Sequence, residues 1–167
     1  MERKFFVTVV GIIALVGGGA YVFLTNPPAQ APGEVIPNPL VVEYQNGEYR
    51  FNFPLPDSWK GFSIVTSTWE GTLGVKRIAT GTIISIRNPL WTSEKPYQDI
   101  PIMIFTLQQW NDMSADKFHI GAAPISPSEL GRNTNYVFAL PARYNFAYPL
   151  GVEEVEQILS TKPLQVF

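Results

Sequence analysis

The sequence predicts the α+β fold class: an antiparallel sheet flanked by helices, preceded by one N-terminal transmembrane helix. Three observations lead to this prediction. They are a long uncharged apolar run near the N-terminus, a proline-rich stretch after it, and then β-prone runs separated by turn residues, with two amphipathic segments among them. We therefore divide the chain into a cytoplasmic leader with a transmembrane signal-anchor (1–24), a proline-rich linker (25–39) and an extracytoplasmic domain (40–167).

The apolar run covers residues 5–24, which are 20 positions without a charged side chain. At a helical rise of about 1.5 Å per residue, this run is long enough to cross the hydrocarbon core of a bilayer. Arg3 and Lys4 precede it and the next basic residue is Arg50. The positive-inside rule therefore predicts a single-pass protein of the cytoplasmic membrane, with its N-terminus inside, its domain outside and residues 5–24 in contact with membrane lipid.

Two short patterns near the apolar run leave alternatives open. The tripeptide Ala29–Ala31 matches an A-x-A cleavage site, but the proline after it fits a peptidase poorly, which favours a retained anchor. Ala14 and Gly18 form a small-xxx-small pair that allows membrane helices to pack closely. This pair is consistent with a structural subunit that self-assembles in the membrane, or simply with the abundance of small residues in membrane helices.

The linker, residues 25–39, contains five prolines and one charged residue. Proline fixes φ and lacks a backbone N–H, so this composition excludes a helix or a central strand. At about 3.1 Å per residue in polyproline II, the linker would span roughly 45 Å. It predicts a semi-rigid spacer that holds the domain away from the lipid.

The domain opens with a predicted β-hairpin. Asn46 and Gly47 both tolerate positive φ and lie between two β-prone runs. In the second run, Tyr49, Phe51 and Phe53 alternate with polar residues, as in a half-buried strand that we expect to end at the prolines that follow. Further short strands are expected at 62–69, 80–87, 100–105 and 136–140, and a hairpin or loop at 71–76.

Two later segments predict helices. The segment TLQQWNDM begins with a capping box formed by Thr106 and Gln109. The segment GVEEVEQILSTK places Val152, Val155 and Leu159 on one face and its acidic residues in the first turn, where the helix dipole favours them. We expect one or both of these helices to cover the sheet.

Composition excludes several classes of function. The formal net charge is −2 and no basic run is present, so nucleic acid is not expected as a partner. The absence of cysteine excludes disulfides, thiolate metal sites and cysteine nucleophiles. No cofactor or metal ion is expected. Asp112, Ser114 and Asp116 have the spacing of a calcium loop, but Lys117 stands where its sharp turn needs glycine.

The stretch GEYRFNFPLPDSWKGFSIV resembles the opening of PsbP-like domains, in which an aromatic-rich strand is followed by proline and then tryptophan. The aromatic positions here are Tyr49, Phe51 and Phe53, followed by Pro54 and then by Trp59. The segment GVEEVEQILSTK is similar to the closing helix of that family. The resemblance implies an antiparallel sheet flanked by helices and a binding or accessory role without catalysis. A stalked, exported chain of this build also resembles bacterial membrane-anchored envelope proteins.

A hydrolase of the cell envelope is the competing hypothesis. His119 is the single histidine of the sequence, with Ser114 and Asp116 nearby, but catalytic triads are built from groups that converge in space. The alternative is a polar surface histidine. A carboxylate pair for glycoside cleavage would have to come from acids that are otherwise solvated, namely Asp57, Glu70, Glu94 or Asp99.

The leading hypothesis is a non-catalytic, membrane-tethered domain that binds a protein partner in the cell envelope. Trp91 and Tyr97 lie in a stretch rich in prolines and polar residues, where aromatic side chains offer rigid contact area. Tyr144, Phe146 and Tyr148 alternate as along one face of an edge strand. We expect Trp91, Tyr97, Tyr144 and Tyr148 to contact the partner; the alternative is that Trp91 covers the core and the tyrosines form its rim.

Overall fold

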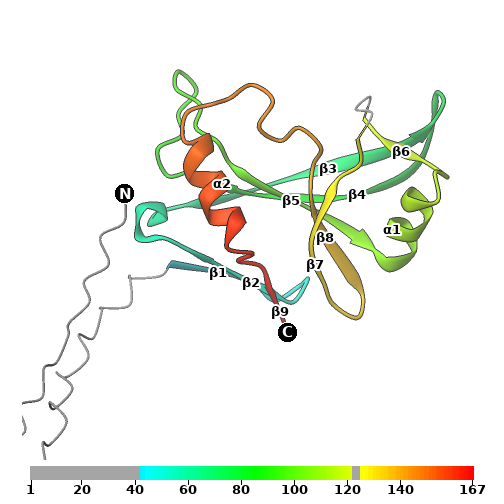
Figure 1. Ribbon diagram of the computed structural model, residues 1–167, viewed down its shortest axis with the longest axis horizontal. Helices are drawn as coiled ribbons and strands as arrows, with labels where there is room; N and C mark the ends of the chain where they lie inside the picture. The colour runs from blue at the N-terminus through cyan, green and yellow to red at the C-terminus, as the bar shows by residue number, and fades with distance from the viewer. Residues whose placement is uncertain (1–41, 122–124) are drawn as a thin grey trace, which may run out of the picture. The chain divides into compact units, whose positions relative to one another are not determined.

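A computed structural model describes residues 42–121 and 125–167, and it confirms an α+β fold dominated by antiparallel strands (Figure 1). In chain order the elements are β1 (Val42–Asn46), β2 (Phe51–Leu55), the 3₁₀ turn η1 (Asp57–Trp59), β3 (Ser63–Leu73), β4 (Lys76–Arg87), β5 (Ile100–Thr106), α1 (Leu107–Ser114), β6 (His119–Ile120), β7 (Ser128–Arg132), β8 (Tyr136–Leu140), α2 (Val152–Ser160) and β9 (Gln165–Val166).

The predicted membrane segment, the linker and the pair Ala14 and Gly18 lie outside the described residues. Within the described ranges, no helix is both long enough and apolar enough to span a membrane.

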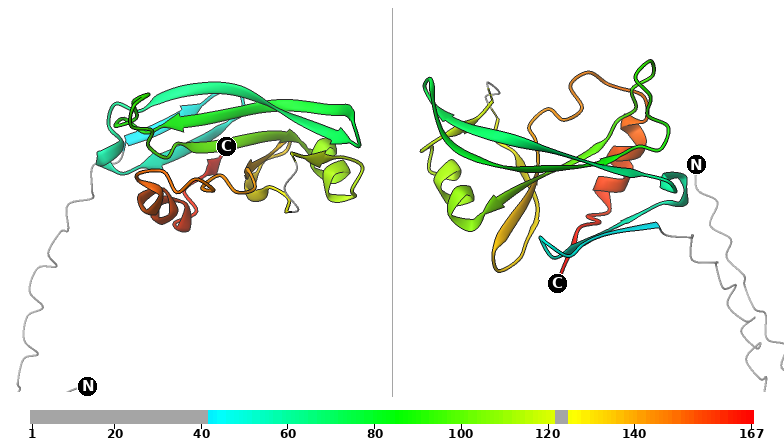
Figure 2. Two further views of the ribbon diagram at one scale, coloured as in Figure 1. Left: turned by 90° about the horizontal axis from the view of Figure 1, so that it is seen from above. Right: turned by 180° about the vertical axis from the view of Figure 1, so that it is seen from behind.

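The strands form two sheets, and the pairings between strands are antiparallel. The smaller sheet has the order β1-β2-β9 and the larger one the order β6-β3-β4-β5-β8-β7. Figures 1 and 2 show the larger sheet strongly twisted, with α1 and α2 towards its opposite ends. The chain returns from α2 to the smaller sheet through β9, so the last helix and the first hairpin are joined by strand pairing.

The hairpin predicted at Asn46 and Gly47 is confirmed, but the residue in the left-handed region is Arg50, with a φ of 62°. The turn is longer than two residues, because β1 ends at Asn46 and β2 begins at Phe51. The Asn46 side chain accepts a hydrogen bond from the Tyr49 N–H (2.8 Å), and its carbonyl accepts one from the Arg50 N–H (2.9 Å). Asn46 therefore caps the turn and leaves the positive φ to Arg50.

The prediction that the prolines end the second strand is wrong for the first of them. Strand β2 continues through Pro54 to Leu55. On its far side β2 pairs with β9 only at Phe51 and Asn52, so this edge is open at Pro54. A residue without an N–H is tolerated at an open edge.

The strands expected at 62–69 and 80–87 are present but much longer than predicted. Strand β3 has 11 residues and β4 has 12, and they form one hairpin. The turn between them consists of Gly74, with a φ of 59°, and Val75. Glycine at the first central position is typical of a type II′ turn, whose twist matches that of the paired strands. The stretch 71–76 is therefore a hairpin, as predicted.

Strand β5 is buried on both of its faces. Ile100, Ile102 and Ile104 belong to a core cluster that also contains residues of β2 and α2. Met103 and Phe105 belong to a second cluster, which contains residues of α1. Because successive side chains of a strand point to opposite faces, the two clusters lie on opposite faces of the larger sheet along β5.

Both predicted helices are confirmed. Thr106 and Gln109 form the reciprocal capping box, in which Thr106 Oγ1 accepts from the Gln109 N–H (3.1 Å) and Gln109 Oε1 accepts from the Thr106 N–H (2.9 Å). In α2 the buried residues are Val152, Val155 and Ile158, and Leu159 lies at the margin of the core.

A tight contact between Trp69 and Gly81 shapes the hairpin of β3 and β4. The two residues are paired across the strands, and the Trp69 indole donates a hydrogen bond to the carbonyl of Ile104 (2.9 Å). A Cβ atom at position 81 would lie 2.5 Å from this ring. Since the indole is held by its hydrogen bond and is buried, it has no room to move away.

We predict that Gly81→Ala lowers the free energy of unfolding by about 1–3 kcal/mol, because the added methyl group overpacks the core. Chemical denaturation of the two proteins measures this difference. Gly47→Ala is the matched control, since a Cβ there meets no atom within 4 Å, and its free energy of unfolding should be close to that of the wild type. Equal losses in both variants would contradict this account of the contact.

Candidate functional site

Two loops lie side by side near the N-terminal end of α2: residues 88–99, which connect β4 to β5, and residues 141–150, which lie between β8 and the residue before α2 (Figures 1 and 2). Tyr97 and Leu150 form a parallel bridge between them, and the Gln98 N–H donates to the Leu150 carbonyl (2.8 Å). The loops are distant in sequence, and they carry all four residues predicted to bind a partner.

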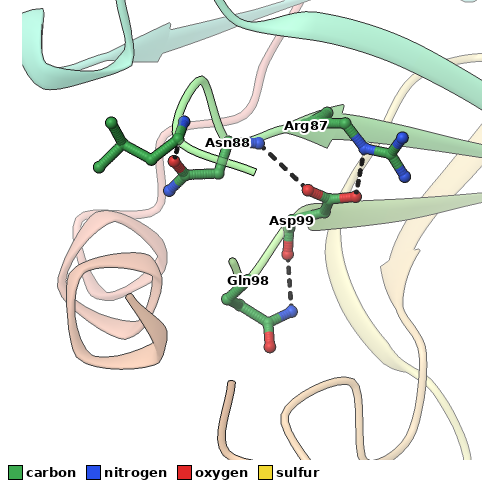
Figure 3. A network of polar contacts seen from close by, with 5 residues as sticks. Arg87, Asn88, Gln98 and Asp99 are labelled. Atoms are coloured by element: carbon green, nitrogen blue, oxygen red, sulfur yellow. Dashed lines mark hydrogen bonds and ion pairs between the residues drawn. The ribbon is translucent and has the colours of Figure 1, made fainter. Parts of the chain in front are cut away.

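One carboxylate, that of Asp99, joins the two ends of the first loop (Figure 3). Its oxygens accept hydrogen bonds from Arg87 Nε (3.2 Å) and from the Asn88 N–H (3.1 Å). The buried Asn88 side chain in turn accepts a hydrogen bond from the Leu90 N–H (2.9 Å). Charge-assisted bonds of this kind are stronger than neutral ones, so the two ends of the loop are held firmly together.

Gln98 joins the first loop to the second. Its side chain is buried, and its Nε2 donates to the carbonyl of Asp99 (2.7 Å) and to the carbonyl of Tyr144 (3.4 Å). Together with the backbone bond from Gln98 to Leu150, these contacts hold the second loop at two points, Tyr144 and Leu150. The two loops therefore form one connected unit.

Trp91 and Tyr97 are half-buried, and each has a cation near its ring. The Arg87 guanidinium lies 4.0 Å from the centre of the Trp91 ring, and the Lys95 ammonium lies 5.8 Å from that of Tyr97. Tyr97 also packs close to Gly151, at the start of α2. Arg87 thus contacts both Asp99 and Trp91, which orients the indole relative to the loop.

Tyr144 and Tyr148 differ in their surroundings. Tyr144 is half-buried against the core, which agrees with the alternative that it is part of the core rim, whereas 76% of Tyr148 is exposed. The edge strand expected here is wrong: this stretch is a run of turns, and positive φ values at Arg143 and Tyr148 prevent an extended chain.

Sequence reasoning missed three apolar residues of these loops as site candidates. Exposed fractions are 61% for Leu90, 75% for Phe146 and 48% for Leu150. The sequence feature that could have identified them is a large apolar residue inside a turn-rich stretch. We use the name two-loop surface for Leu90, Trp91, Tyr97, Phe146, Tyr148 and Leu150.

The candidates for hydrolysis lie elsewhere. His119 is exposed on the short strand β6, opposite Thr72. Asp112, in the second turn of α1, forms an ion pair with Lys117 (2.7 Å), and the hydrogen bond from Lys117 lowers the pKa of its carboxyl. Among residues 42–121 and 125–167, no group of three or more His, Cys, Asp or Glu side chains is placed to hold a metal ion.

The four acids considered for a carboxylate pair have separate neighbours. Glu70 forms an ion pair with Arg77 (2.7 Å) near the tip of the β3–β4 hairpin. Asp99 accepts the hydrogen bonds that close the first loop. The hydrogen bond from Ser93 lowers the pKa of Glu94. Asp57 is exposed in η1. A groove of about 610 Å³ between β2 and α2 is lined half by prolines and aliphatic side chains and half by polar ones, with Glu154 as its acid.

No family model, curated protein or solved structure matches this chain.

We predict that Asp99→Ala lowers the free energy of unfolding by about 1–3 kcal/mol, because it leaves the Asn88 N–H and the Arg87 guanidinium without their acceptor. The loop at 88–99 should also become more sensitive to limited proteolysis. Glu94→Ala, in the same loop but exposed, is the control and should change neither measurement. Unchanged stability in Asp99→Ala would show that this carboxylate does not hold the loop.

A second prediction concerns pH. Burial, and then the negative charge of Glu156, raise the pKa of Tyr144 above its ordinary value of 10.0. A raised pKa in the folded state means that this tyrosine contributes stability below pH 10, which is lost as the pH rises through the folded-state pKa. The absorbance of phenolate, compared between the wild type and Tyr144→Phe, isolates this residue.

The pKa of Tyr144 should move back towards 10.0 in Glu156→Gln, because the negative charge of Glu156 is then removed while the burial of Tyr144 remains. If the difference in absorbance between the wild type and Tyr144→Phe titrates with the ordinary pKa of 10.0, the half-buried placement of Tyr144 is contradicted.

Proposed function

We propose that this chain is a membrane-tethered, extracytoplasmic binding protein without catalytic activity, and that its domain binds a protein of the cell envelope through the two-loop surface. Residues 5–24 anchor it in the cytoplasmic membrane, and residues 25–39 hold the domain at a distance from the lipid. The domain is PsbP-like in this proposal.

The observation that carries the proposal is the exposure of large apolar side chains on loops that are themselves held in place. Phe146 and Tyr148 are each about three-quarters exposed, so their side chains contribute little to the packing of the core. Tyrosine, tryptophan and phenylalanine are enriched in protein interfaces, and the first two also among the few residues that carry most of the binding energy. Because the hydrogen bonds of Gln98 and Asp99 already order these loops, binding a partner costs little further conformational entropy.

The sequence supports the tether. The 20-residue apolar run follows Arg3 and Lys4, and the linker after it is rich in proline. A spacer of this length suits a protein whose partner lies at a distance from the lipid surface.

The first hairpin and the last helix support the PsbP-like assignment. Phe51, Phe53 and Trp59 are fully buried, and they share one core cluster with Val155 and Ile158 of α2. The aromatic strand, the tryptophan after it and the closing helix, which carry the resemblance, thus pack together in one core.

We predict that the double variant Phe146→Ala and Tyr148→Ala reduces recovery of the partner by about tenfold or more, because truncating exposed interface aromatics costs over 1 kcal/mol each. The full-length protein is crosslinked in its native membrane, captured and its partner identified by mass spectrometry. Binding of that partner is then compared among variants, with Trp91→Ala and Tyr97→Ala included.

The matched control is Val75→Ala, which alters an exposed apolar residue at the tip of the β3–β4 hairpin. It should leave recovery of the partner unchanged. If the loop variants capture the same partner as well as the control does, the two-loop surface is not the binding site. Thermal melts of all variants establish that they remain folded.

A further inference from the structure

The outer edge of β3 is the longest unpaired strand edge in the described part of the chain. Strand β3 pairs with β4 along its length on one side, whereas on the other side β6 pairs only with Gly71 and Thr72. Figure 1 shows β3 at the border of the larger sheet, with β6 beside one end. Along the remaining eight residues, Ser63 to Glu70, no strand among the described residues pairs with this edge, and backbone N–H and C=O groups face outward at every second position.

From Ser63 to Glu70 this edge lacks most of the features with which proteins protect exposed strands: its one charged residue is Glu70, and the register shift of β3 lies just beyond, between Gly71 and Thr72. Such edges usually carry lysine or proline, a bulge, or very few residues. The edge strand at the opposite border, β7, follows this rule, because it has five residues, a register shift between Glu129 and Gly131 and an ion pair from Glu129 to Arg132. Between Ser63 and Glu70 there is no proline, no basic residue and no register shift.

The side chains on this edge favour strand pairing. The stretch SIVTSTWE is dominated by β-branched and aromatic residues, which have the highest strand propensities. Six of its eight residues are exposed, among them Ile64 with 38% of its surface accessible. The buried one is Trp69, whose ring lies in the core, so the strand is held firmly while its outer edge stays open.

The charges on the edge favour an identical strand as the occupant. Glu70 is the one charged residue of the stretch, and its carboxylate already forms an ion pair with Arg77 of the same hairpin (2.7 Å). When two copies meet antiparallel about Ser67, Glu70 faces Ile64 and Thr66 faces Thr68 of the other copy. No like charges are then opposed, and the paired threonines are a favourable cross-strand combination.

We propose that two copies of this chain associate through antiparallel pairing of their β3 edges, from Ser63 to Glu70, so that their larger sheets become one continuous sheet. The association is isologous, with a two-fold axis passing through the edge. It uses the domain itself, and it is independent of the membrane pair Ala14 and Gly18 and of the two-loop surface.

Cysteine scanning tests the pairing directly, because the chain contains no cysteine of its own. Single variants from Ile64→Cys to Thr68→Cys are made in the full-length protein in membranes and oxidised. Only the residue on the two-fold axis faces its own copy, at a Cα separation of about 4.5–5.5 Å that a disulfide spans. We expect one position to give a covalent dimer at about ten times the yield of Asn111→Cys, an exposed control on α1.

A uniform yield along the strand, or one equal to the control, would overturn the proposal. So would a crosslinked product whose mass is not twice that of the chain, because the occupant would then be a different protein.

Charge exchange at Thr66 provides the second test. Thr66 is exposed, so a charged side chain there is compatible with folding. In the background of the best cysteine, Thr66→Lys and Thr66→Glu alone should each lower the dimer yield by about threefold, because the two residues at position 66 are then diagonal neighbours of like charge across the paired strands. A mixture of the two should restore it. Failure of the mixture to recover more dimer than either variant alone would contradict a pairing of two copies at this edge.

Discussion

The burial of β5 on both faces is the constraint on which the rest of the structure depends. Its isoleucines face the first hairpin and α2, whereas Met103 and Phe105 face α1 and Trp69. Each of these side chains contributes about 1.5–3 kcal/mol when it is fully removed from water. One strand therefore joins two cores that would otherwise be separate, and each helix packs into one of them.

The two loops that carry the two-loop surface are held in place through this strand. Asp99 immediately precedes Ile100, which is completely buried, so the carboxylate that closes the first loop is attached to the most constrained part of the chain. Gln98 extends the same order to the second loop through Tyr144 and Leu150. The aromatic and aliphatic side chains at the surface are consequently displayed by hydrogen-bonded loops on a rigid support.

Local patterns predicted the elements well where one short-range interaction decides the outcome. The capping box of α1 is made by Thr106 and Gln109 alone, and it forms as its spacing indicates. The strand at Tyr136–Leu140 has the predicted bounds, since a compact apolar run specifies it. The left-handed residue of the first turn was not predictable in this way, because it depends on the register between β1 and β2.

The sequence by itself determined the antiparallel α+β class, the absence of cysteine chemistry and the four aromatic candidates, because these follow from composition and from periods of two and 3.6 residues. Only the tertiary structure decided that two loops some 50 residues apart are joined at Gln98 and that β6, β7 and β9 are strands. The open edge of β3 could not be predicted from the sequence either. Such features depend on which strands become neighbours, and pairing partners are selected by the packing of the whole core.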